Sequence, residues 1–224
     1  LAPTGSQIGR GEPLKDTARV LSKMVDCIML RTFEHEKLEE FSSYSDVPVI
    51  NGLSDSFHPC QLLADLLTYI EARGSIENKN VVWLGDGNNM CHSYMNAARI
   101  FNFQLIVSCP KEFVPNSKIF ESSKKNTSIE HDPYKAADGA DLIITDVWAS
   151  MGKEDEQKDR KEKFMRYQVN SEIMSCAKDN ALFMHCLPAH RGEEVTEDVL
   201  EGSQSIVWEE AGNRLHSQKA LLEF

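Results

Sequence analysis

The stretch Phe183-Met184-His185-Cys186-Leu187-Pro188-Ala189 decides the fold, because a short apolar run ends there on an imidazole, a thiol and a proline. Two other apolar runs end in a similar way. Residues 81–84 precede Gly85-Asp86-Gly87-Asn88-Asn89, and residues 142–145 precede Asp146-Val147-Trp148-Ala149-Ser150-Met151-Gly152. Ligands of open parallel sheets bind at the carboxyl ends of the strands. We therefore expect a ligand site where these three runs end.

Strand-like and helix-like segments alternate along the chain, which indicates an α/β fold with parallel sheets. Strands are expected at 27–30, 47–50, 81–84, 104–108, 142–146, 181–185 and 205–208. Helices are expected at 17–26, 35–43, 58–72, 92–101, 168–177 and 212–223. The two βα units before residue 58 are too few for an independent core. The sequence thus predicts two parallel-sheet α/β domains, the first incomplete, joined by long helices.

The composition is that of a globular protein, with 41% hydrophobic and 26% charged residues among 224. The net charge of −11 argues against nucleic acid or an anionic membrane as the main partner. No apolar stretch approaches the roughly 18 residues that span a bilayer, and residues 1–10 do not resemble a signal peptide. Six scattered cysteines without a C-x-x-C pair favour a reducing compartment and argue against structural zinc. A cytoplasmic protein fits best, although a processed organellar form stays open.

The turn Gly85-Asp86-Gly87 suggests a dinucleotide fingerprint at first sight. Its third glycine is replaced by Met90, and strand 104–108 ends without the acidic residue that would hold a ribose. A tight turn that presents the amides of Asn88 and Asn89 is the better interpretation. An amide donates to a carboxylate and accepts from an ammonium, so it suits an amino acid. Turn chemistry alone would explain either asparagine equally well.

Asp146 follows a strand, where a carboxylate could bind an ammonium group or cap a helix. The next residues, Ser150-Met151-Gly152, could form a mobile lid over a bound ligand. The charge run 153–163 is most simply a solvated segment.

Four cationic or amide side chains are candidates for binding an anion or a carbonyl. His58 opens a helix with Gln61 one turn further on, so both lie on one face near the end that attracts anions. Arg31 follows a strand, and a planar guanidinium suits phosphate or carboxylate. Arg214 is a further cation, although a surface helix arginine would look the same. For His58 and Gln61, a helix cap with a surface glutamine is an equally good explanation.

Cys186 could be a nucleophile, a metal ligand or a hydrogen-bonding thiol. A hydrolase would need His185 or His190 as a base, but His185 points to the opposite face of an extended strand. A zinc site built from these three residues lacks a clear further ligand.

The motifs together resemble those of the ornithine carbamoyltransferases, within the aspartate/ornithine carbamoyltransferase family. The resemblance covers almost the whole chain. The motifs that carry it are 16–22, His58-Pro59-Cys60-Gln61, 85–89, 146–152, His185-Cys186-Leu187-Pro188 and Asn213-Arg214-Leu215-His216. Cys60 replaces the family's usual threonine. The family's Ser-x-Arg-Thr phosphate signature is absent, so we expect an N-terminal segment to be missing and the phosphate site to be incomplete.

The resemblance implies roles for the site residues. Carbamoyl phosphate would be bound by Arg31, His58, Gln61, Cys186, Leu187 and Arg214. Ornithine would be bound by Asn89, Asp146, Ser150 and Met151. Arg31, His58, Asp146 and Cys186 would be the catalytic residues. The implied domains are a carbamoyl phosphate-binding remainder at 1–57, an interdomain helix at 58–72, a Rossmann-like ornithine-binding domain at 73–208, and a C-terminal helix at 209–224 that packs back towards the first domain.

The implied reaction converts carbamoyl phosphate and L-ornithine into L-citrulline and phosphate, as in arginine biosynthesis or the urea cycle. It needs no metal or organic cofactor. The family also implies a homotrimer, or a multiple of one, and closure of residues 150–152 over ornithine. Two alternatives remain: an inactive ornithine-binding fragment, and a transcarbamylase for another amine such as putrescine.

Overall fold

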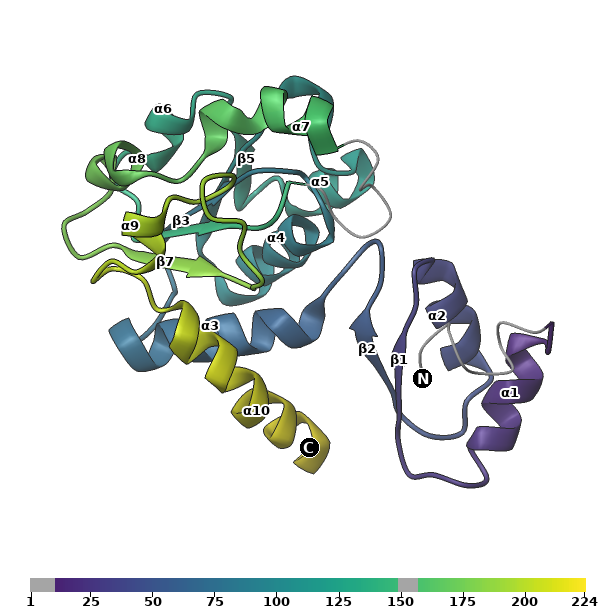
Figure 1. Cartoon of the computed structure of the whole chain (residues 1–224). Coiled ribbons are helices and arrows are strands. Elements are labelled where there is room, and N and C mark those ends of the chain that lie inside the picture. Colours follow the sequence, from purple (N-terminus) through teal and green to yellow (C-terminus); the bar gives the residue numbers. More distant parts are fainter. Residues whose placement is uncertain (1–10, 149–156) are drawn as a thin grey trace. The chain divides into compact units, whose positions relative to one another are not determined.

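The computed structural model describes residues 11–148 and 157–224, and it divides into two compact units, Leu1–Cys60 and Gln61–Phe224 (Figure 1). The first unit contains helices α1 (Leu14–Leu21) and α2 (His35–Ser43) and strands β1 (Ile28–Arg31) and β2 (Val49–Leu53). The two strands pair in parallel. Their small core is formed by Ala18, Ile28, Leu30, Leu38 and Phe41.

The second unit is built on a parallel sheet of five strands in the order β5-β4-β3-β6-β7. These strands are β3 (Asn80–Leu84), β4 (Gln104–Ser108), β5 (Thr127–Ile129), β6 (Leu142–Thr145) and β7 (Leu182–His185). From the central β3 the chain builds outward through β4 to β5, then returns to place β6 on the other side of β3. The strand order therefore reverses between β3 and β6, which is where sheets of this kind bind ligands.

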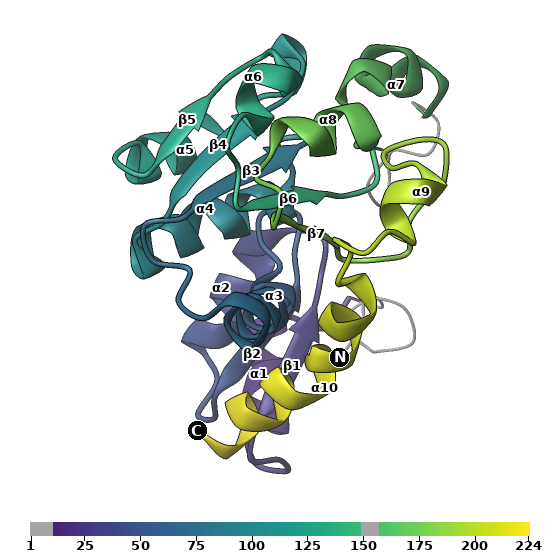
Figure 2. The same cartoon turned by 90° about the vertical axis from the view of Figure 1, so that its left-hand side faces the viewer.

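Alternate residues of each strand enter two separate cores, as expected for a sheet covered on both faces. Val81 and Trp83 join the core that includes residues of α3 (Pro59–Arg73) and α4 (Asn89–Phe101). Val82 and Leu84 join the core that includes residues of α6 (Pro133–Ala137) and α8 (Ser171–Cys176). Figure 2 shows the helices on the two sides of this sheet.

The remaining helices are α5 (Ser117–Ser123), α7 (Gln157–Phe164), α9 (Glu197–Leu200) and α10 (Val207–Glu223), with short 3-10 turns at Lys111–Phe113 and Met165–Tyr167. Helix α3 begins at the end of the first unit, and its longer part lies in the second. That part contacts α10, where the Asn213 amide donates to Thr68 Oγ1 at 2.9 Å and to Glu71 Oε2 at 2.7 Å.

The α/β class with parallel sheets is confirmed, whereas some expected elements are wrong. Residues 205–208 are not a strand: Ser205 forms one isolated bridge to Phe183, and α10 begins at Val207. The expected helix at 17–26 is α1, which begins earlier and ends at Leu21. The edge strand β5 was not expected, because three residues carry too little periodicity to be recognised.

No helix in the described part of the chain is long and apolar enough to cross a membrane. All six cysteines lie in that part, and each is a free thiol.

Candidate functional site

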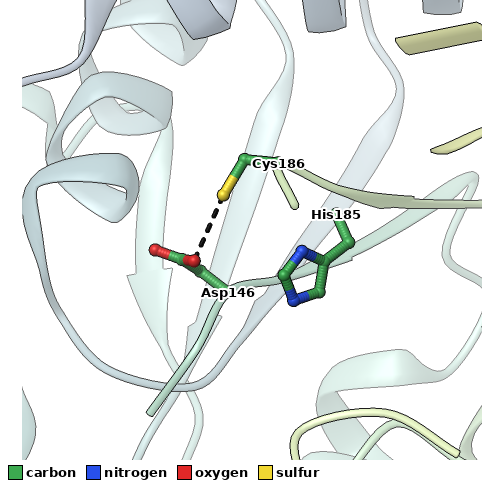
Figure 3. A group of neighbouring side chains, drawn as sticks. All are labelled: Asp146, His185 and Cys186. Carbon is green, nitrogen blue, oxygen red and sulfur yellow. Dashed lines mark hydrogen bonds between the residues drawn. The ribbon is translucent and has the colours of Figure 1, made fainter. Parts of the chain in front are cut away.

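Three strand ends meet around Asp146, which follows β6. Asn88, in the loop after β3, donates from Nδ2 to Asp146 Oδ2 at 2.9 Å. Cys186, which follows β7, donates from Sγ to Asp146 Oδ1 at 3.1 Å (Figure 3). The Val147 backbone N–H also donates to Oδ1, at 2.7 Å. The Asp146 side chain is therefore held by hydrogen bonds from both neighbouring strand ends at the point where the strand order reverses.

The loop after β3 is shaped by its asparagine and its glycines. Asn88 caps α4: its Oδ1 accepts from the N–H groups of Met90 and Cys91 at 3.0 and 3.1 Å. A Cβ added at Gly87 would lie 2.3 Å from Pro115 N, so only glycine fits this close backbone approach. Asn88 thus both caps the helix and contacts Asp146, whereas Asn89 is the first residue of α4 and is half-buried.

The Cys186 thiol is held in its protonated form. Burial, followed by the negative charge of Asp146 and of Glu210, raises its pKa well above the usual range. A nucleophilic cysteine needs the opposite environment, in which a nearby cation or base favours the thiolate. Of the three roles considered for this residue, the structure favours the hydrogen-bonding thiol.

The His185 side chain forms a hydrogen bond with the backbone that follows it. Its Nδ1 accepts from the Leu187 N–H at 2.9 Å, so Nε2 carries the proton and donates to Glu194 Oε1 at 3.1 Å. Leu187 itself has a positive φ of 54°, which is uncommon for a residue with a branched side chain. Ligand-type atoms of Asp146, His185 and Cys186 lie within 4.8 Å of one another. Both ring nitrogens of His185 are already bonded to protein, which does not favour a metal site here.

A second group of polar side chains lies buried between α3 and α10. Arg214 donates from Nη1 to Gln61 Oε1 at 2.7 Å. Gln61 Nε2 in turn donates to Asp65 Oδ1 at 2.9 Å and to Glu210 Oε1 at 3.0 Å. Tyr94 donates its hydroxyl to Asp65 Oδ2 at 2.6 Å. The structure thus brings together Gln61 and Arg214, two candidates from the sequence. Gln61 also contacts two carboxyl groups that sequence reasoning did not identify.

The two groups are connected through Glu210. Its Oε2 accepts from the His185 backbone N–H at 2.9 Å, so it binds the strand end that leads to Cys186. Burial raises the pKa of Asp65 to about 6. Burial, together with the charge of Asp65, raises the pKa of Glu210 well above its usual value. Strongly perturbed carboxyl groups beside candidate ligand-binding side chains are typical of functional sites.

The remaining candidates lie in the first unit or outside the described residues. Arg31 ends β1 and is exposed, and His58 is buried directly before α3. Ser150 and Met151, with the expected lid at 150–152, fall within 149–156 and lie outside the described residues.

The interpretation of 153–163 as a solvated segment is wrong for Arg160, which is 1% exposed and forms a buried ion pair with Asp86. Its Nε donates to Trp148 O at 2.5 Å, and its guanidinium lies over the Phe113 ring, 4.5 Å from the centroid. A tertiary partner on the β3 loop and aromatic neighbours therefore bury a charge that local composition assigns to solvent. Lys161 and Lys163 of the same run remain exposed.

Family models match both parts of the chain. Residues 2–71 match the aspartate/ornithine carbamoyltransferase carbamoyl-P binding domain, and residues 77–224 match the Asp/Orn binding domain of the same family. The chain belongs to the aspartate/ornithine carbamoyltransferase family. This confirms the resemblance inferred from the motifs, and it makes the chain a member of a family of carbamoyl-transferring enzymes.

Individual relatives from this family agree. The chain is 59% identical to ornithine carbamoyltransferase of Methylococcus capsulatus and 60% identical to that of Nitrosococcus oceani, and it covers 75% and 73% of their lengths. Among solved structures, ornithine carbamoyltransferase of Pyrococcus furiosus has a TM-score of 0.93 at 48% identity and that of Burkholderia thailandensis has 0.90 at 50%. The alignments cover 97% and 98% of this chain and 72% of each solved chain. The chain thus spans about three quarters of the length of these relatives.

Proposed function

We propose that this chain transfers the carbamoyl group of carbamoyl phosphate to the δ-amine of L-ornithine, giving L-citrulline and phosphate. The observation that carries the proposal is the Asp146–Cys186 contact at the strand reversal, in a chain whose close relatives are named ornithine carbamoyltransferase.

The environment of Asp146 suits a single ammonium group. Because the pKa of Cys186 is raised, the thiol stays neutral and the pair carries one negative charge. Asn88 and Cys186 hold both carboxylate oxygens in place, which fixes the position to which a cationic side chain is attracted. We assign Asp146 and Cys186 to the ornithine side chain. From the resemblance we assign Asn89, Ser150 and Met151 to the same ligand.

The chemistry requires cationic and hydrogen-bonding groups at the carbamoyl carbon. The amine, which titrates near 10 when free, must lose a proton before its nitrogen attacks. The new N–C bond forms as the C–O bond to phosphate breaks, and the departing phosphate can accept the proton. Negative charge develops on the carbonyl oxygen, and cations stabilise it. We assign Arg31, His58, Gln61, Arg214 and the Cys186–Leu187 backbone to carbamoyl phosphate.

The proposal includes a cytoplasmic homotrimer, or a multiple of one, that acts in arginine biosynthesis. These points rest on the family resemblance, together with the acidic, thiol-bearing composition of the chain.

Two aspartates at opposite ends of β6 provide a matched test. Asp146→Asn removes the proposed ammonium partner after the strand. Asp141→Asn removes a carboxylate before it, which accepts from Lys178 Nζ at 2.7 Å and from the Asn80 N–H at 2.9 Å. We expect Asp146→Asn to lower kcat/KM for ornithine about a hundredfold or more, because the variant loses one contact between charged groups. Asp141→Asn should retain turnover. Equal loss in both variants would contradict the assignment.

A further inference from the structure

Two buried carboxyl groups use both hydrogens of one amide. Asp65 is 2% exposed and Glu210 is 1% exposed, and each accepts one hydrogen bond from Gln61 Nε2. The amide oxygen of Gln61 faces the other way and accepts from Arg214. Because a carbonyl oxygen has two lone pairs, it can accept a further hydrogen bond, whereas the nitrogen has no hydrogen left to donate.

We propose that Asp65 and Glu210 are positioning residues that fix the orientation of the Gln61 amide, so that Gln61 can only accept a hydrogen bond from a ligand. This inference rests on the proposed function. In that context the ligand group that Gln61 recognises is the –NH2 of carbamoyl phosphate, and the two carboxyls act through Gln61 without touching the ligand.

The reversed amide would be strongly disfavoured. Its oxygen would face two buried carboxyl groups, and its nitrogen would face the Arg214 guanidinium. Each mismatch leaves a buried polar group without a suitable partner. The carboxyls therefore set the orientation through hydrogen-bond complementarity.

The buried site disfavours two negative charges on this pair of carboxyls. Burial raises the pKa of both carboxyls, and the charge of Asp65 also raises that of Glu210. Besides Gln61, the groups that face the pair are the Tyr94 hydroxyl of α4, Arg214 of α10, the His185 N–H at the end of β7 and the Cys186 thiol that follows it.

Glu210 contacts both the Gln61 amide and the end of strand β7. Its two oxygens accept from Gln61 Nε2 and from the His185 backbone N–H. A glutamine at 210 offers one acceptor to these two donors. Since a backbone N–H cannot be turned around, the new amide oxygen should stay with His185, and its –NH2 should face Gln61. The Gln61 –NH2 then keeps only Asp65 as an acceptor, so its orientation should be held less firmly than in the parent.

The test compares two phosphates that differ in one group. Acetyl phosphate carries a methyl where carbamoyl phosphate carries –NH2, so it cannot donate to Gln61. We expect the parent protein to bind carbamoyl phosphate more tightly in calorimetric titrations. In Glu210→Gln, Kd for carbamoyl phosphate should rise about tenfold to a hundredfold, and Kd for acetyl phosphate much less. The preference between the two ligands should therefore shrink.

The control is Glu71→Gln, which alters another carboxyl that contacts an α10 amide, that of Asn213. It should keep the parental preference. Asp65→Asn is a second variant: its amide oxygen can still accept from Gln61, and its –NH2 can donate to Tyr94, whose hydroxyl can rotate. It should keep more of the preference than Glu210→Gln. An unchanged preference in a folded Glu210→Gln would overturn the inference.

A measurement without ligand separates this inference from the proposed function. The two side-chain amide protons of Gln61, assigned by their loss in Gln61→Glu, should exchange slowly with solvent in the parent and faster in Glu210→Gln. Equal exchange rates would overturn the positioning role even if citrulline is formed. Parental protection without any carbamoyl phosphate binding would support the positioning of Gln61 and contradict the proposed function.

Discussion

The Cys186 thiol donates to Asp146 across 3.1 Å, and the two residues follow the neighbouring strands β7 and β6. This contact joins two of the three strand ends at which the sequence predicts a ligand site. It also gives the thiol a defined role, because a protonated sulfur that donates to a carboxylate orients that carboxylate and adds no second charge.

The chemical reactivity of Cys186 should reflect this environment. With its pKa raised by burial and by Asp146, Cys186 should react with iodoacetamide at pH 8 far more slowly than Cys27 and Cys176, although the side chains of all three are half-buried. Asp146→Asn should accelerate the modification by removing a negative charge. Peptide mass spectrometry over time measures all three rates. Alkylation of Cys186 as fast as of Cys27 would contradict the protonated thiol.

The buried ion pair of Arg160 with Asp86 should be costly to break. Arg160→Ala leaves a carboxylate that is 7% exposed without its cation, so we expect a loss of about 3–5 kcal/mol of unfolding free energy. Lys163→Ala is the control, because its ion pair with Asp159 is exposed to solvent and should contribute far less to stability. Urea unfolding measures both. Losses of equal size would refute the special role of Arg160.

Part of this architecture could be predicted from local sequence and part could not. Alternating apolar runs identified β3, β4, β6 and β7, and the polar residues after them identified Asp146 and Cys186. Local sequence patterns could not predict the roles of Asp65 and Glu210. These residues are 145 positions apart in the sequence and come together only when α3 and α10 pack. The prediction for Arg160 was wrong for the same reason, since only the folded chain shows the carboxylate and the aromatic rings that bury it.

The stability of the protein should depend on pH through Asp65. Its pKa rises from 3.8 to about 6 on folding, so the folded state holds the proton more tightly than the unfolded state. The stabilising contribution is complete below about pH 3.8 and is lost as pH rises through about 6. Relative to Asp65→Asn, the parent should therefore lose unfolding free energy between pH 4 and pH 7. Chemical denaturation at several pH values measures this difference, and a relative gain over that range would have the wrong sign.

The acceptor used in carbamoyl transfer tests the central claim most directly. Carbamoyl phosphate labelled in its carbonyl carbon should be incubated with the protein and, separately, with ornithine, putrescine or aspartate, and the products separated by chromatography. The account predicts labelled citrulline from ornithine and at most traces of product from the other two amines. Product from putrescine or aspartate alone, or no product from any acceptor while ornithine still binds, would contradict it.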